Sequence, residues 1–306
     1  MANDHTASLM TPAKLAQVAS RPKAPVSPAA WLDQMAADAG HAQLLRLSEL
    51  SELLATHGRA RKQAAAGQAL EQLGQALGEL DFGLLESRGW WARTTGKSRS
   101  AGADFAARFE QAGQAANRLA EQLAGLHKTR QAEAAANERV LVEFEVEYRA
   151  LDKIIDQGGR WLQDMRNQLK ARHASAADDA ARAQVQEDAA RRDILVARLK
   201  LLRAVRDAAQ ALHQQAQAVA GQHGAFAQAL QQAVAPELKS WRARLAALAS
   251  AAEDGKEAAL AIDEGKETHR GLRRRIKQAT ADELGLQQGE AALQHSLEAM
   301  GLQLAA

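Results

Sequence analysis

The placement of the prolines limits what this chain can fold into more than any other feature. Four of the five prolines lie in the first 28 residues, and the fifth is Pro236. Proline inside a helix removes a backbone hydrogen bond and costs about 3 kcal/mol, so long proline-free stretches permit long helices. The sequence is rich in alanine, leucine, glutamine and arginine, which are strong helix formers, and only 4 % of it is aromatic. We therefore predict an all-α protein, an elongated bundle of long antiparallel helices with coiled-coil-like seams.

Two apolar stripes carry the seam prediction. Each repeats at alternating steps of about three and four residues, the spacing of a coiled-coil seam. The first stripe is Leu202, Val205, Ala209, Leu212, Ala216, Val219, His223, Phe226, Leu230 and Ala233. The second is His269, Leu272, Ile276, Ala279, Glu283, Leu286, Glu290, Leu293, Leu297, Met300 and Leu304. Their similar lengths predict antiparallel partners joined near Pro236, with a weak or partly exposed middle in the second stripe.

The isolated Pro236 predicts a helix boundary, because proline is tolerated in the first turn of a new helix. We expect one helix to end near Val234 and the next to open at Pro236. Trp241, Leu245 and Leu248 then supply its apolar stripe.

The remaining organisation follows from composition. Residues 1–28 are expected to form a disordered tail, 29–88 an N-terminal helical segment, 89–103 a basic linker, and 104–306 the long-helix bundle. Trp90 and Trp91 in the linker either plug a helix corner or contact a membrane or partner surface. The segment from Val140 to Arg149 alternates apolar and acidic residues like a strand, but Val140, Phe144, Tyr148, Leu151 and Ile155 share one helix face, and we favour the helix. A helix hairpin is expected near Ala174–Asp178, with Ser175 capping the next helix.

Composition excludes several classes of function. The net charge is +2, from 39 basic and 37 acidic residues, whereas a dedicated nucleic-acid binder is usually strongly basic. There is no cysteine, so disulfides, thiolate metal sites and thiol redox chemistry are absent. No apolar run approaches the roughly 20 residues of a membrane span, and the N-terminus lacks a signal-peptide core. We expect a cytoplasmic protein, with peripheral contact at the inner face of the membrane left open.

No catalytic, metal or cofactor site is predicted. The residues Gly96-Lys97-Ser98 match the end of a P-loop motif, but Trp91 occupies the position where that motif needs another glycine. The histidines form no metal-ligand spacing, and no nucleophile and base combination is evident. We expect a non-enzyme without cofactors.

The sharpest charged cluster is cationic. Arg270, Arg273, Arg274 and Lys277 share one helix face beside Leu272 and Ile276. That face could bind anionic lipid head groups, an acidic partner or an oxyanion. The alternative is a solvated face paired with nearby acids.

Two stretches resemble the TelA/KlaA family of bacterial toxic-anion (tellurite) resistance proteins, over roughly residues 70–304. In the first, LDKIIDQGGRWL, the positions Leu151, Ile155 and Gly158 match the family pattern. The second is a leucine- and arginine-rich helix followed by a proline and a tryptophan–basic pair, here Pro236, Trp241 and Arg242. The family's proline lies two residues before the tryptophan, whereas Pro236 lies five before it.

The resemblance implies a role in resistance to tellurite and related stress, and it supplies no catalytic residues. Since the chain has no thiol, we expect it to protect indirectly, as a scaffold for protein partners or at the membrane surface. The alternatives are a BAR-like membrane-associated structural protein unrelated to anions, and an oxyanion-binding protein. The partner's identity and a homo-oligomeric state stay open.

Overall fold

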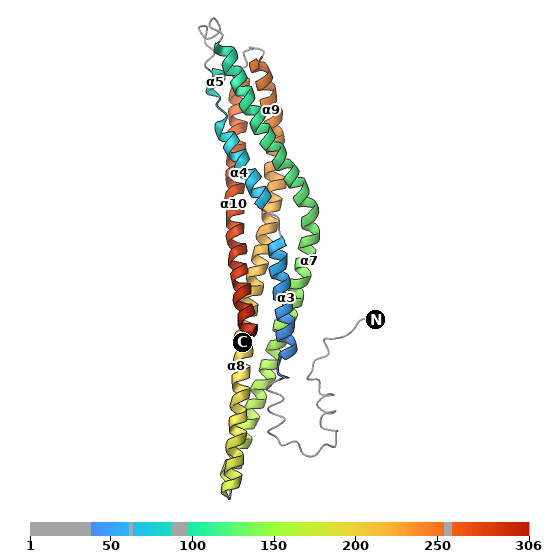
Figure 1. Cartoon of the computed structure of the whole chain (residues 1–306), viewed down its shortest axis with the longest axis vertical. Helices are drawn as coiled ribbons and strands as arrows, with labels where there is room; N and C mark the ends of the chain where they lie inside the picture. Colours follow the sequence, from blue (N-terminus) through green and yellow to red (C-terminus); the bar gives the residue numbers. More distant parts are fainter. Residues whose placement is uncertain (1–37, 61–63, 87–96, 254–258, 306) are drawn as a thin grey trace, which may run out of the picture. The chain divides into compact units, whose positions relative to one another are not determined.

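The computed structural model describes residues 38–60, 64–86, 97–253 and 259–305, without the side chains at 59–60, 64–65, 86, 97–100, 127–131, 251–253 and 259–261. All its regular elements are helices, which confirms the all-α prediction for the described residues. Figure 1 traces them in order. They are α3 (His41–Ala60), α4 (Ala64–Glu79), α5 (Gly83–Glu86), α7 (Lys97–Ser175), α8 (Asp179–Ala229), the π-helical turn η1 (Leu230–Val234), α9 (Ala235–Glu253) and α10 (Ala259–Ala305).

The chain divides into two compact units. Unit 1 comprises residues up to Gln43 together with Ala150–Ala204, and unit 2 comprises Leu44–Arg149 together with Val205–Ala306. Residues 1–28 and the pair Trp90 and Trp91 lie outside the described residues. The expected linker at 89–103 is only partly described, and its part from Lys97 onward already belongs to α7.

Unit 1 is built on a helical hairpin, as predicted. α7 ends at Ser175 and α8 begins at Asp179. The predicted cap was wrong, because the backbone N–H of Ala181 donates to Asp178 Oδ1 at 2.6 Å. Ser175 Oγ instead donates back to the carbonyl of Arg172 at 3.2 Å. Aspartate accepts from the first-turn amides and also carries a charge that favours a helix N-terminus.

Glycine lets the helices of unit 1 approach closely. A Cβ atom added at Gly158 on α7 would lie 2.7 Å from a methyl carbon of Leu199 on α8. Gly40 has a φ of 71°, a left-handed conformation that favours glycine, and a Cβ there would lie 2.8 Å from Leu202. Two leucines of the hairpin, Leu199 and Leu202, therefore pack directly against glycine backbone, at Gly158 and Gly40.

Unit 2 is a bundle in which neighbouring helices run antiparallel. Gly67 and Gly78 of α4 face Glu283 and Arg273 of α10, so the numbering rises on one helix as it falls on the other. The core of unit 2 draws on α4, α5, α7, α8, η1, α9 and α10, and includes Leu73, Phe105, Leu119, Phe226, Trp241, Leu245, Leu272 and Ile276. The segment 140–149 is helical, and all five residues of its predicted buried face are buried.

The boundary at Pro236 differs from the prediction. The helical conformation does not stop at Val234, because Ala235 keeps right-handed helical angles and its N–H donates to the carbonyl of Leu230, five residues back. This π turn absorbs one extra residue, so the buried position after Leu230 is Val234 in place of Ala233. The antiparallel pairing of the two stripes is observed, but the chain reverses between α9 and α10, after Glu253.

We predict opposite effects of substitution at two adjacent glycines. Gly158→Leu should destabilise the protein by about 1–3 kcal/mol, because the added side chain overlaps Leu199. A Cβ atom added at Gly159 would have no heavy atom within 4 Å, so Gly159→Ala should stabilise the helix by about 0.5–1 kcal/mol. Urea unfolding followed by circular dichroism measures both changes, and equal effects at the two positions would contradict the close contact.

Candidate functional site

The cationic cluster predicted on α10 is present as one exposed face. Arg270, Arg273, Arg274 and Lys277 are all exposed, while Leu272 and Ile276 beside them are buried. Glu267 lies 3.5 Å from Arg270 Nη1 and 3.7 Å from Arg274 Nη2. Two of the four cations thus share a single carboxylate, and the face keeps an excess of positive charge.

The first family-like motif is structural. Leu151 and Ile155 are buried in unit 1, and Gly158 provides the close approach to Leu199. These residues hold the helical hairpin together, and none of the three has a reactive or charged side chain.

The second family-like motif fixes α9 against α7. Trp241 is fully buried, with its ring centroid 5.4 Å from that of Phe109. Arg242 Nη2 donates to the carbonyl of Gly113 at 3.4 Å. Pro236 is exposed beside the π turn. The motif therefore sets helix packing in unit 2.

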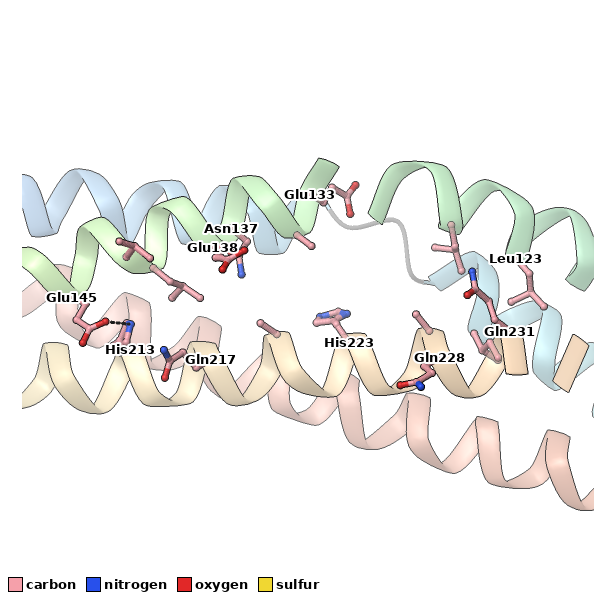
Figure 2. Close-up of a pocket in the computed structure, with 18 residues that line it drawn as sticks. Leu123, Glu133, Asn137, Glu138, Glu145, His213, Gln217, His223, Gln228 and Gln231 are labelled. Atoms are coloured by element: carbon pink, nitrogen blue, oxygen red, sulfur yellow. Dashed lines mark ion pairs between the residues drawn. The ribbon is translucent and has the colours of Figure 1, made fainter. Parts of the chain in front are cut away.

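Sequence reasoning missed a groove of about 890 Å³ between α7 and the α8–η1 segment. We call it the α7–α8 groove; Figure 2 shows Glu145 of α7 pointing across it toward His213 of α8. Its lining runs from Leu123 to Glu145 on α7 and from His213 to Gln231 on α8 and η1. It lies wholly within unit 2.

The groove forms because α8 carries small residues at positions where large side chains would fill the space against α7. Ala220, Gly224 and Ala227 of α8 face it, at steps of four and three residues. They lie next to the seam positions Val219 and Phe226, which are buried in the core. This second stripe of small residues, parallel to the seam, was the signal in the sequence that could have revealed the groove.

Three glutamates are among the described residues that line the groove. Glu133, Glu138 and Glu145 line it, and none of the described lining residues is lysine or arginine. His213 is buried with its Nε2 4.0 Å from Glu145 Oε2, and its ring lies 5.6 Å from that of Tyr148.

Polar residues of the two stripes meet each other. His223 Nε2 lies 2.8 Å from Glu290 Oε1. Glu283 is buried opposite Gly67 and accepts a hydrogen bond from Gln287. The prediction of a weak or partly exposed middle is wrong at Glu283, which is buried, and both carboxylates of the second stripe have polar partners. A polar pair at seam positions fixes the register of two helices.

His269 is buried where α10 meets α4 and α5. Its ring centroid lies 5.2 Å from that of Phe82. Burial, and next the charge of Arg273, lower the pKa of His269 to about 4, although a hydrogen bond with the backbone of Leu77 opposes the shift. The ring is therefore neutral at physiological pH.

No group of three or more metal-ligating side chains comes together in the part of the chain described. None of the described helices has the long apolar run that crossing a bilayer requires.

The fold and these surfaces define an all-α protein of packed antiparallel helices. The chain belongs to the TelA family of toxic anion resistance proteins, whose family model matches residues 32–272. The match ends at Leu272, so Arg273, Arg274 and Lys277 lie beyond it. No curated protein and no solved structure matches the chain.

We predict a pH-dependent stability that depends on His269. Its pKa is lower in the folded than in the unfolded state, so the unfolded state binds more protons between about pH 6.5 and pH 4. Stability is then retained above pH 6.5 and falls by about 2–3 kcal/mol toward pH 4. His269→Phe should flatten this dependence in urea unfolding series, and an unchanged slope would contradict the assignment.

Proposed function

We propose that this family member supports resistance to toxic anions as a non-enzymatic scaffold for protein partners. The observation that carries the proposal is the presence of three glutamates among the described lining residues of the α7–α8 groove. Cationic side chains bind an oxyanion, and thiolates act as nucleophiles and metal ligands. This groove presents glutamates instead, and the chain has no cysteine.

Long packed helices suit this role. Their exposed sides offer extended surfaces for other proteins, as helical assemblies commonly do. A cytoplasmic location, the absence of a cofactor and protein partners in place of nucleic acid belong to the same proposal.

Tellurite tolerance and calorimetry together test the scaffold. Deleting the gene should lower tolerance, and restoring the wild-type copy should recover it. Isothermal titration of the purified protein with tellurite, selenite or phosphate should give no binding heat, because no described hollow concentrates cations. Saturable heat that is lost on neutralising Arg270, Arg273, Arg274 and Lys277 would favour the oxyanion-binding alternative and overturn the scaffold.

A membrane-surface role is the second candidate, favoured by the exposed cationic face of α10. Anionic lipid attracts each nearby lysine or arginine by about 1 kcal/mol, and salt screens the attraction. The BAR-like alternative without a link to anions predicts the same binding together with unchanged tellurite tolerance.

For this candidate we predict co-sedimentation with phosphatidylserine-containing vesicles at low salt. The fourfold variant R270Q/R273Q/R274Q/K277Q should lose most of the binding. The control R118Q/R139Q/R166Q/K170Q removes the same charge from other exposed positions and should retain it. Equal loss in both variants would show a nonspecific charge effect and remove the α10 face as a membrane site.

A further inference from the structure

We propose that the α7–α8 groove binds one amphipathic helix from a partner protein, with apolar residues on its inner face and lysine or arginine along its edges. The proposal rests on the scaffold function and names the chemistry of the partner.

The length of the groove favours a helix over a small molecule. Its lining covers 22 residue steps of α7, from Leu123 to Glu145, which is about 33 Å of helix. On the opposite side, the lining from His213 to Gln231 covers about 27 Å of helix. A bound helix about 10 Å across, with half its diameter inside the groove over this shorter length, would occupy roughly 1,100 Å³. The groove volume of about 890 Å³ is close to this value. A compact ligand would leave most of such a length empty.

The floor of the groove is apolar. Leu123, Leu126, Leu141, Val142 and Leu230 line it. Val142 is 55 % exposed although it is a large apolar residue on a long helix. Leu123 and Leu126 are half-buried, and Leu141 and Leu230 are buried. A groove with an apolar lining and a polar rim is typical of helix-in-groove recognition, in which the bound helix presents apolar anchors at three- and four-residue spacing.

Charge selects the partner. Glu133 and Glu138 are exposed, and neither forms an ion pair within the described part of the chain. Glu145 adds a third carboxylate, which contacts Arg149 of its own helix. The exposed carboxylates of Glu133 and Glu138 complement lysine or arginine and disfavour an acidic helix.

The small residues of α8 leave room for the incoming side chains. Gly224 lines the groove, and a Cβ atom placed on it would have no heavy atom within 4 Å. Gly221, three residues earlier on the same helix, has the same open surroundings but does not line the groove. The chain thus offers a matched pair of positions, one inside the groove and one outside it.

The test uses the full-length protein and two synthetic peptides. One is a fluorescein-labelled 21-residue peptide of three LKKLLKL repeats, and the other replaces every lysine by glutamate. Both present the same leucine face, so they differ only in the sign of their charge. Fluorescence anisotropy should show saturable binding of the lysine peptide, at least tenfold tighter than the glutamate peptide, and weaker binding at high salt.

Substitutions then locate the binding. Gly224→Trp should weaken the lysine peptide at least tenfold by filling the groove, whereas Gly221→Trp should leave binding within twofold. E133Q/E138Q should weaken binding several-fold, and E71Q/E121Q, which removes two exposed acids elsewhere in unit 2, should not. Circular dichroism of each variant confirms that the helices are retained.

Several outcomes would overturn the groove proposal. These are equal affinity for both peptides, equal effects of the two tryptophan variants, or no effect of E133Q/E138Q. Sedimentation showing a dimer that Gly224→Trp dissociates would assign the groove to a second copy of this chain, and would also overturn it. The scaffold function fails separately, through anion-binding heat or unchanged tellurite tolerance, so the two failures are distinguishable.

Discussion

The continuity of the helix across Pro236 sets the arrangement of unit 2. Proline cannot donate a backbone hydrogen bond, and its ring crowds the carbonyl four residues earlier. The π turn at Leu230–Val234 relieves this by widening one turn, with Ala235 bonding to Leu230. Because the turn takes up one extra residue, Val234 and Trp241 remain buried like Leu230 before them. α9 can therefore extend the surface of α8, and one antiparallel helix, α10, packs along both.

Small residues decide how closely these helices approach and where they separate. At Gly67 and Gly271, side chains of the opposing helix, Glu283 and Glu237, reach the backbone. At Gly224 nothing from the opposing side fills the space. The same residue type thus produces close packing in one place and the α7–α8 groove in another, depending on what the partner helix presents.

Charge is distributed unevenly over unit 2. The groove is lined by glutamates, while the exposed face of α10 carries arginines and a lysine. A net charge of +2 conceals this separation. The cationic face lies mostly beyond the family match, so that match gives it no support as a family feature.

The sequence by itself determined the helical class, the hairpin before Asp179 and most buried positions, because three- and four-residue spacing of apolar residues is a local property of one helix. It also contained the family motifs, whose residues prove to be packing residues. Only the tertiary structure decided that the helix continues past Pro236, that His223 meets Glu290, and that Ala220 and Gly224 border an open groove. The last two depend on which residues of a distant helix lie opposite, and a single helix face does not encode that pairing.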